Sequence, residues 1–259
     1  MAGGETWREA NGRIEPDGPV TEALLDLCHS YVARRGAGVP VEVAKRHDGV
    51  AGTGWLLAVA VVRDEARVRI AETLELALAA GVGLHAVADC VAYVELASQL
   101  FAGKPVEMAV EAATGRPAVT VRTAAPELCG ESVADALAAG LWALGRPGGV
   151  ADVVRTLAST ASPGVTAAAA GLVGLRDGGG AVPAHWHRRL HCSASCLALA
   201  PGLVRARCRG DVPRGDRVVV RATCNRVGSP SLDPFVRAFP PQVAATDFLR
   251  RPLLGAGVR

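Results

Sequence analysis

Five residues that could hold a metal lie close together late in the chain. The segment HWHRRLHCSASC contains His185, His187, His191, Cys192 and Cys196. On a helix, His187 and His191 stand four residues apart, as do Cys192 and Cys196, and this spacing can hold Zn²⁺ on one face. Two arginines interrupt the cluster and no Cys-x-x-Cys pair is present. A helix with exposed histidines and half-buried cysteines is therefore the simpler interpretation, and a zinc site is the alternative.

Other reactive residues give weaker signals. Cys28 and His29 are neighbours in sequence, but adjacent residues of a helix point to different sides, so they do not predict a nucleophile and its base. The glycine-rich segments 145–149 and 177–180 follow no expected strand and carry no Lys-Ser or Lys-Thr pair. We interpret both as turns between helices rather than phosphate loops. His47 and His85 are expected at the surface or at helix ends.

The elements that must position these residues are helices. Residues 21–35 place leucines, Cys28 and Tyr31 on one face and charged residues on the other, and Gly36 follows. A short helix is expected after Pro40, and Gly52-Thr53-Gly54 is expected to break the chain before an apolar stretch. Further helices are predicted at 65–80, 84–102, 104–114, 131–144, 150–159 and 166–175. We therefore expect roughly eight helices between residues 20 and 190, joined by short Gly/Pro turns.

The composition favours an all-α domain. Half of the 259 residues are hydrophobic but only 4% are aromatic, and most of the apolar residues are Ala, Val and Leu. Small apolar side chains let helices pack closely, which suits a helical bundle better than a sandwich.

The segment from Gly130 to Leu190 resembles the C-terminal half of the ADP-ribosylglycohydrolase family. That family has an Ala-rich helix, a Gly-Gly-Asp-x-Asp-Thr turn, a second Ala/Gly helix and an Ile-Pro-x-x-Trp segment. This chain has GESVADALAAGLWAL, then TAAAAGLVGL, and then Val182-Pro183 with Trp186 three residues later. The helix pair in 65–103 is also similar to the family. The resemblance spans residues 20 to 190 and implies a compact all-α ADP-ribosylglycohydrolase-like domain.

The resemblance also shows what this chain lacks. The family's Asp-x-Asp-Thr, which holds two Mg²⁺ ions with an N-terminal Asp pair, corresponds here to Ser162-Pro163-Gly164-Val165. The Asp pair falls on Gly18 and Pro19, and the following Thr falls on Val20. Asp17 would supply one ligand only if the alignment shifted by a residue. The family's opening Gly-Asp-Ala-x-Gly turn lies further upstream, and we expect this chain to be truncated before it.

These losses predict a protein without hydrolase chemistry. Mg²⁺ needs several anionic oxygens at short range, and these positions offer one neutral hydroxyl. Asp135 and Asp152 lie inside expected helices and are interpreted as solvent-facing, while Ser162-Pro163-Gly164 is interpreted as an ordinary turn. We expect no catalytic residues, no metal ligands and no cofactor. The resemblance implies a non-catalytic binding or regulatory homologue whose partner is ADP-ribose or an ADP-ribosylated protein. The alternatives are an active hydrolase releasing ADP-ribose from protein or a small molecule, and an interaction scaffold.

The charge is uneven along the chain. The net charge of +3 arises because residues 200–259 carry 11 Arg against 4 Asp, whereas the rest is mildly acidic. We expect a loose N-terminus at 1–19, the helical domain at 20–191, and a basic Pro/Arg-rich tail at 192–259. Residues 218–220 favour a strand in that tail. A scaffold would use the basic tail, but with only two lysines and few aromatics we expect no nucleic-acid partner.

The chain has no expected membrane anchor or leader. The longest apolar run near the front, Trp55 to Val62, is far short of a span, and the N-terminus has no apolar h-region. Seven scattered cysteines form no disulfide framework, so we expect a cytoplasmic protein with reduced thiols.

Overall fold

The computed structural model describes most of the chain up to residue 187. The described residues are 9–10, 13–14, 18–33, 41–44, 49–117 and 130–187, with short pieces at 198–199, 201–203 and 206–207. The chain divides into two units, Met1–Val212 and Pro213–Arg259. All described residues belong to the first unit, and the tail strand expected at 218–220 lies outside them.

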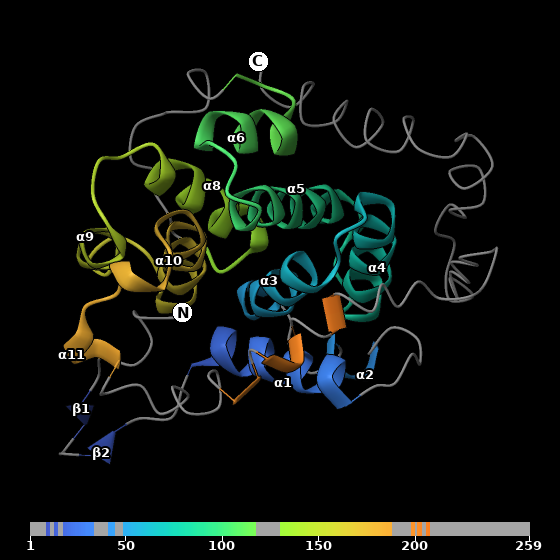
Figure 1. Cartoon of the computed structure of the whole chain (residues 1–259), viewed down its shortest axis with the longest axis horizontal. Helices are drawn as coiled ribbons and strands as arrows, with labels where there is room; N and C mark the ends of the chain where they lie inside the picture. The colour runs from blue at the N-terminus through green and yellow to red at the C-terminus, as the bar shows by residue number, and fades with distance from the viewer. Residues whose placement is uncertain are drawn as a thin grey trace. The chain divides into compact units, whose positions relative to one another are not determined.

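The described elements are helical apart from one very short antiparallel ladder (Figure 1). The ladder pairs β1 (Glu9–Ala10) with β2 (Arg13–Ile14). The helices are α1 (Pro19–Ala33), α2 (Val41–Ala44), η1 (Gly49–Ala51), α3 (Gly52–Val62), α4 (Ala66–Ala79), α5 (Leu84–Phe101), α6 (Val106–Thr114), α8 (Val133–Leu144), α9 (Val150–Leu157), α10 (Pro163–Asp177), η2 (Gly179–Ala181) and α11 (Ala184–His187). The expected all-α class is confirmed, and most expected helices appear within a few residues of their predicted ends.

Helices α3, α5 and α10 form the centre of the bundle. Helix α3 is buried from Gly52 to Ala60 because its sequence is apolar on every side. It packs against α1, α4 and α5, while α10 packs against α8, α9 and α5 (Figure 1). Tyr93 of α5 joins the two groups, since its buried hydroxyl donates to the Ala168 carbonyl of α10 at 2.9 Å.

The expected break at Gly52-Thr53-Gly54 is wrong. These residues form the first turn of α3, and the Thr53 hydroxyl donates to the Val50 carbonyl at 2.7 Å. Glycine is required at 54 because α1 crosses there closely. A Cβ at Gly54 would lie 2.1 Å from the Val20 carbonyl oxygen and 2.7 Å from the Leu24 nitrogen. The lack of a side chain at Gly54 therefore lets the first turns of α1 pack directly against α3.

A buried polar cluster joins α1 to α4. Tyr31 of α1 donates to Glu72 Oε1 at 2.8 Å, and Arg63 binds the other oxygen of Glu72 at 2.5 Å. Arg63 also lies over the Tyr31 ring, 5.1 Å from its centroid. Burial, and then the charge of Glu72, raise the pKa of Tyr31 well above its usual value. The Tyr31 hydroxyl therefore keeps its proton and donates it, and both oxygens of the buried Glu72 carboxylate accept a hydrogen bond within the cluster.

The described pieces between 198 and 207 pack on the helical unit. Leu199, Gly202 and Ala206 are buried there. These contacts lie within the segment expected to belong to the tail, and the division between the two units falls after Val212. No helix in the described part of the chain is long and apolar enough to cross a membrane.

Candidate functional site

The candidate site lies where the first turns of α1 and α10 meet. Val20 in α1 and Ala167 in α10 are each 2% exposed and form a buried apolar cluster. The Gly54 crossing places the start of α1, and the contacts of α10 with η1 and α8 place the start of α10. The structure thus brings together the two segments, 18–20 and 162–165, that the resemblance assigns to metal binding.

Ser162-Pro163-Gly164 begins a helix, so its interpretation as an ordinary turn is wrong. The Ser162 hydroxyl accepts from the Val165 amide at 3.3 Å as an N-cap, and Pro163 occupies the first helical position. The Thr166 amide donates to the Ser162 carbonyl at 2.9 Å. The one side-chain oxygen in the 162–165 segment is therefore already engaged in capping α10.

An apolar side chain occupies the space beside Gly164. A Cβ at Gly164 would lie 2.5 Å from Val50 Cγ1, well inside contact distance. Val50 is held by η1, where its amide donates to the Glu131 carbonyl at 2.9 Å. Gly164 and Val165 are buried. The start of α10 is consequently packed against hydrocarbon.

Acidic residues at the starts of α8 and α9 have other roles. Asp135 caps α8 in a reciprocal box with Ser132, and Asp152 on α9 pairs with Arg155 at the surface. Glu131 is exposed just before α8. In the part of the chain that the structure describes, no group of three His, Cys, Asp or Glu side chains could hold a metal ion. Asp17 lies outside the described residues.

Two buried hydroxyls at the same helix ends were not anticipated from the sequence. Thr21 of α1 and Thr166 of α10 are 4% and 1% exposed, and neither hydroxyl has a hydrogen-bond partner among the described residues. By contrast, Thr53, Thr73 and Thr114 each donate to a carbonyl of the preceding turn. A buried polar group without a partner is costly unless water or a ligand satisfies it. The signal in sequence was only a Thr in the first turns of two apolar helices.

The structure describes only some of the reactive residues that the sequence contains. His191, Cys192 and Cys196 lie outside the described residues, so the zinc alternative stays a prediction. Cys28 is buried and His29 is exposed, as expected for neighbours on a helix. His85 is exposed in the first turn of α5. Trp186 is buried and its amide donates to the Pro183 carbonyl at 2.8 Å.

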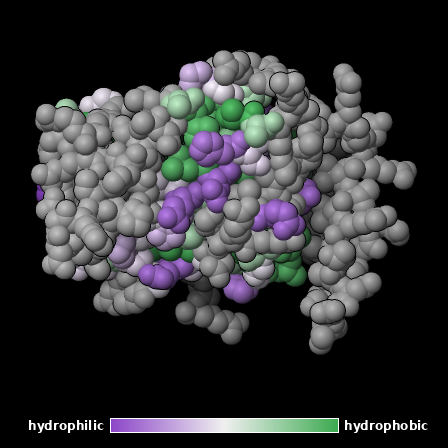
Figure 2. Space-filling model, turned by 90° about the horizontal axis from the view of Figure 1, so that it is seen from below, coloured by the Kyte–Doolittle hydropathy of each residue, from purple (hydrophilic) through white to green (hydrophobic). Residues whose placement is uncertain are grey.

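The outer surface near α1 is polar. Viewed from below Figure 1, on the side where α1 lies, hydrophilic residues form a band with hydrophobic residues beside it (Figure 2). Glu22 and His29 are exposed on α1, whereas Ala23, Leu27 and Tyr31 face the core. His29 therefore belongs to the solvated face of the helix.

Comparison with known proteins supports the fold. No family model matches the chain, and no curated protein matches it. A solved structure titled "ADP-ribosylglycohydrolase-related protein complex" is similar, with a TM-score of 0.64 and 22% sequence identity. The match covers 78% of this chain and 87% of that chain. The described helices therefore have an ADP-ribosylglycohydrolase-like fold, which confirms the resemblance at the level of fold.

Proposed function

We propose that this chain is a metal-independent, non-catalytic relative of the ADP-ribosylglycohydrolases that binds ADP-ribose or an ADP-ribosylated protein. The observation that carries the proposal is the packing where α1 meets α10. Val50 occupies the space beside Gly164, and Val20 packs with Ala167. The family resemblance places Mg²⁺ at these helix ends, whereas apolar side chains pack there in this chain.

The residues at these helix ends do not fit a pair of hard cations. Mg²⁺ prefers octahedral oxygen coordination with carboxylates. Val20 and Gly164 supply no side-chain oxygen, and the Ser162 hydroxyl is engaged as a cap. A carboxylate could not be added at Gly164 without displacing Val50. The proposed function therefore involves no metal.

The same helix ends retain features suited to a polar, anionic ligand. The N-terminus of a helix carries partial positive charge, and α1 and α10 each have 15 residues. Thr21 and Thr166 add two buried hydroxyls that have no partner in the described structure. We infer that a ligand hydroxyl or phosphate oxygen satisfies at least one of them. Without Mg²⁺, the diphosphate charge must be met by these helix ends and by arginines.

Calorimetry with ADP-ribose tests the proposal. We expect binding that is the same in Mg²⁺ and in EDTA. Thr166→Val keeps the side chain's shape but removes the hydroxyl, so it should weaken binding about tenfold, the cost of one or two lost hydrogen bonds. Thr73→Val is the matched control, because the Thr73 hydroxyl is buried but already donates to the Arg69 carbonyl at 2.7 Å. Its affinity should be unchanged.

The outcomes separate the possible roles. Binding that requires Mg²⁺ would contradict a metal-independent site. If ADP-ribose does not bind at all, the proposed ligand is wrong and only a regulatory role through a partner protein remains. Equal losses in the Thr166→Val and Thr73→Val variants would show that the effect is one of folding.

A further inference from the structure

The side chain of Tyr93 runs from α5 to α10 inside the bundle. Tyr93 is 0% exposed, and its hydroxyl donates to the Ala168 carbonyl at 2.9 Å. Burial raises the pKa of this hydroxyl far above its usual value. The hydroxyl therefore keeps its proton throughout the neutral pH range and always donates it toward α10.

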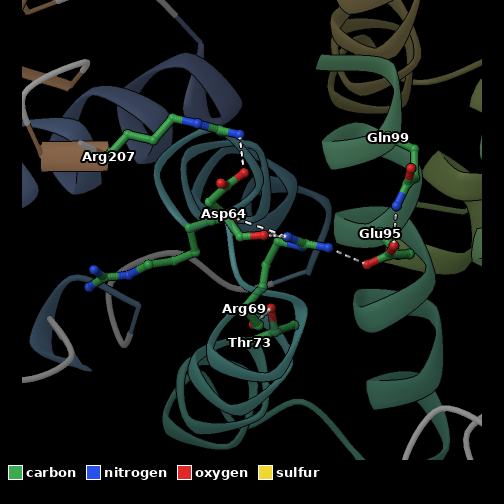
Figure 3. A network of polar contacts seen from close by, with 7 residues as sticks. Asp64, Arg69, Thr73, Glu95, Gln99 and Arg207 are labelled. Carbon is green, nitrogen blue, oxygen red and sulfur yellow. Dashed lines mark hydrogen bonds and ion pairs between the residues drawn. The ribbon is translucent and has the colours of Figure 1, made fainter. Parts of the chain in front are cut away.

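The part of α5 that carries Tyr93 is tied to α4 by charged groups. Two residues after Tyr93, Glu95 pairs with Arg69 Nη2 of α4 at 2.7 Å (Figure 3). Arg69 Nη1 donates to the Asp64 carbonyl at 2.7 Å, and Arg207 binds the side chain of Asp64 (Figure 3). The side chain of Arg69 is 4% exposed, so salt and water screen its ion pair little. Tyr93 therefore reaches α10 from a helix whose own position is fixed.

Short side chains alone would define the rotation of the first half of α10 poorly. Residues 167–171 are four alanines and a glycine, which form only shallow ridges for a neighbouring helix to engage. Val50 lies beside Gly164, but apolar contacts of this kind have no preferred direction. The hydrogen bond from Tyr93 to Ala168 does have one, because it requires both a distance and an angle.

The position of α10 at Ala168 also decides the position of the Thr166 hydroxyl. Thr166 lies two residues earlier, about 3 Å along the helix axis. A rotation or shift of α10 at Ala168 is therefore carried to Thr166, whose buried hydroxyl has no partner among the described residues. A ligand that bonds to this hydroxyl is sensitive to such a movement, because hydrogen bonds weaken steeply as their angle is distorted.

We propose that Tyr93 is a positioning residue of the ligand site. It does not contact the ligand, and its bond to the Ala168 carbonyl holds α10 in the rotation that presents the Thr166 hydroxyl. This inference rests on the proposed function, in which Thr166 binds ADP-ribose.

Calorimetry with ADP-ribose on the full chain tests this role. Tyr93→Phe keeps the ring and removes the hydroxyl, so it should weaken binding about fivefold, the effect of one hydrogen bond. In a Thr166→Val background the same change should weaken binding by no more than about twofold, because no hydroxyl is left to position. Thr114→Val is the control, because the buried Thr114 hydroxyl donates within α6, to the Val110 carbonyl at 2.8 Å. Its affinity should equal that of the wild type.

Two results would overturn the positioning role. A fivefold loss from Tyr93→Phe both with and without the Thr166 hydroxyl would show that Tyr93 acts through general stability. No loss in the otherwise wild-type chain would show that α10 keeps its rotation without this bond.

A measurement without ligand separates this inference from the proposed function. If the wild type does not bind ADP-ribose, the proposed function fails, and the effect of Tyr93 on Thr166 is read from NMR. The methyl resonance of Thr166 should shift in Tyr93→Phe and stay in place in Thr114→Val. An unshifted Thr166 methyl in Tyr93→Phe would refute the positioning of Thr166 by Tyr93.

Discussion

Adding one carbon at Gly164 tests whether Val50 fills the space beside that residue. In Gly164→Ala the new Cβ would lie 2.5 Å from Val50 Cγ1 and 3.6 Å from Cγ2. Carbon atoms in contact are about 3.5–4.0 Å apart, so Val50 or the start of α10 must move by about 1 Å. Val50 is only 7% exposed and its backbone is held by Glu131, which limits that movement.

The expected cost follows from two opposing terms. Overpacking a core costs about 1–3 kcal/mol. Replacing glycine by alanine in a helix stabilises the folded state by up to about 1 kcal/mol, because alanine has the higher helix propensity. We therefore expect Gly164→Ala to lower the free energy of unfolding by about 1–2 kcal/mol, and to lower Tm by about 2–4 °C for each kcal/mol in a unit of this size.

Thermal and urea unfolding measure the effect, with a control on the same helix. At Gly174 a Cβ would meet only Val150 Cγ2 at 4.0 Å, an ordinary contact, so Gly174→Ala should be neutral or stabilising. In a double-mutant cycle, Val50→Ala should relieve at least about 1 kcal/mol of the Gly164→Ala penalty. If Gly164→Ala is as stable as the wild type, or if Val50→Ala relieves nothing, the space beside Gly164 is open and the argument against a metal there fails.

Three further substitutions test other parts of the account, each by chemical unfolding. Gly54→Ala should destabilise by about 3 kcal/mol, at the upper end for overpacking, because its Cβ meets the α1 backbone rather than a movable side chain; a neutral result would refute the close crossing. Tyr93→Phe should cost about 1 kcal/mol by removing the bond to Ala168, and no cost would show that this bond does not join α5 to α10. Burial raises the pKa of the Asp89 carboxyl, with His85 partly offsetting the rise. Because the folded chain then holds that proton more tightly, the stability of the wild type should fall as pH rises from the ordinary carboxyl range through the raised pKa. Asp89→Asn should remove this fall and be more stable near neutral pH, and an unchanged pH profile would contradict the shift.

Helical periodicity located the bundle because its helices are long and amphipathic or Ala-rich. The prediction failed at Gly52-Thr53-Gly54, where glycine provides a close crossing with α1 and the sequence shows only two helix breakers. It failed in the same way at Ser162-Pro163-Gly164, which caps a helix. Local sequence cannot tell a turn from a first helical turn when the deciding contact comes from a distant segment.

The candidate site was located by resemblance rather than by periodicity. The resemblance points to the positions of Val20 and Gly164, but Val50, which fills the space beside Gly164, lies more than 100 residues away in sequence and carries no signal. The same is true of Arg207, whose partners Val61, Asp64 and Phe101 come from two helix ends. Such contacts depend on tertiary packing.

Hydrolysis of ADP-ribosylated protein is the most direct test of the central claim. Glycosidic cleavage passes through an oxocarbenium-like state and needs an oriented water, and losing one electrostatic stabiliser costs about 10²–10³ in rate. The purified chain should be incubated with labelled ADP-ribosylated substrate, with Mg²⁺ and with EDTA, beside an intact ADP-ribosylglycohydrolase. We predict no release of ADP-ribose by this chain in either condition. Release that scales with the concentration of this protein would contradict the account, whether or not it requires Mg²⁺.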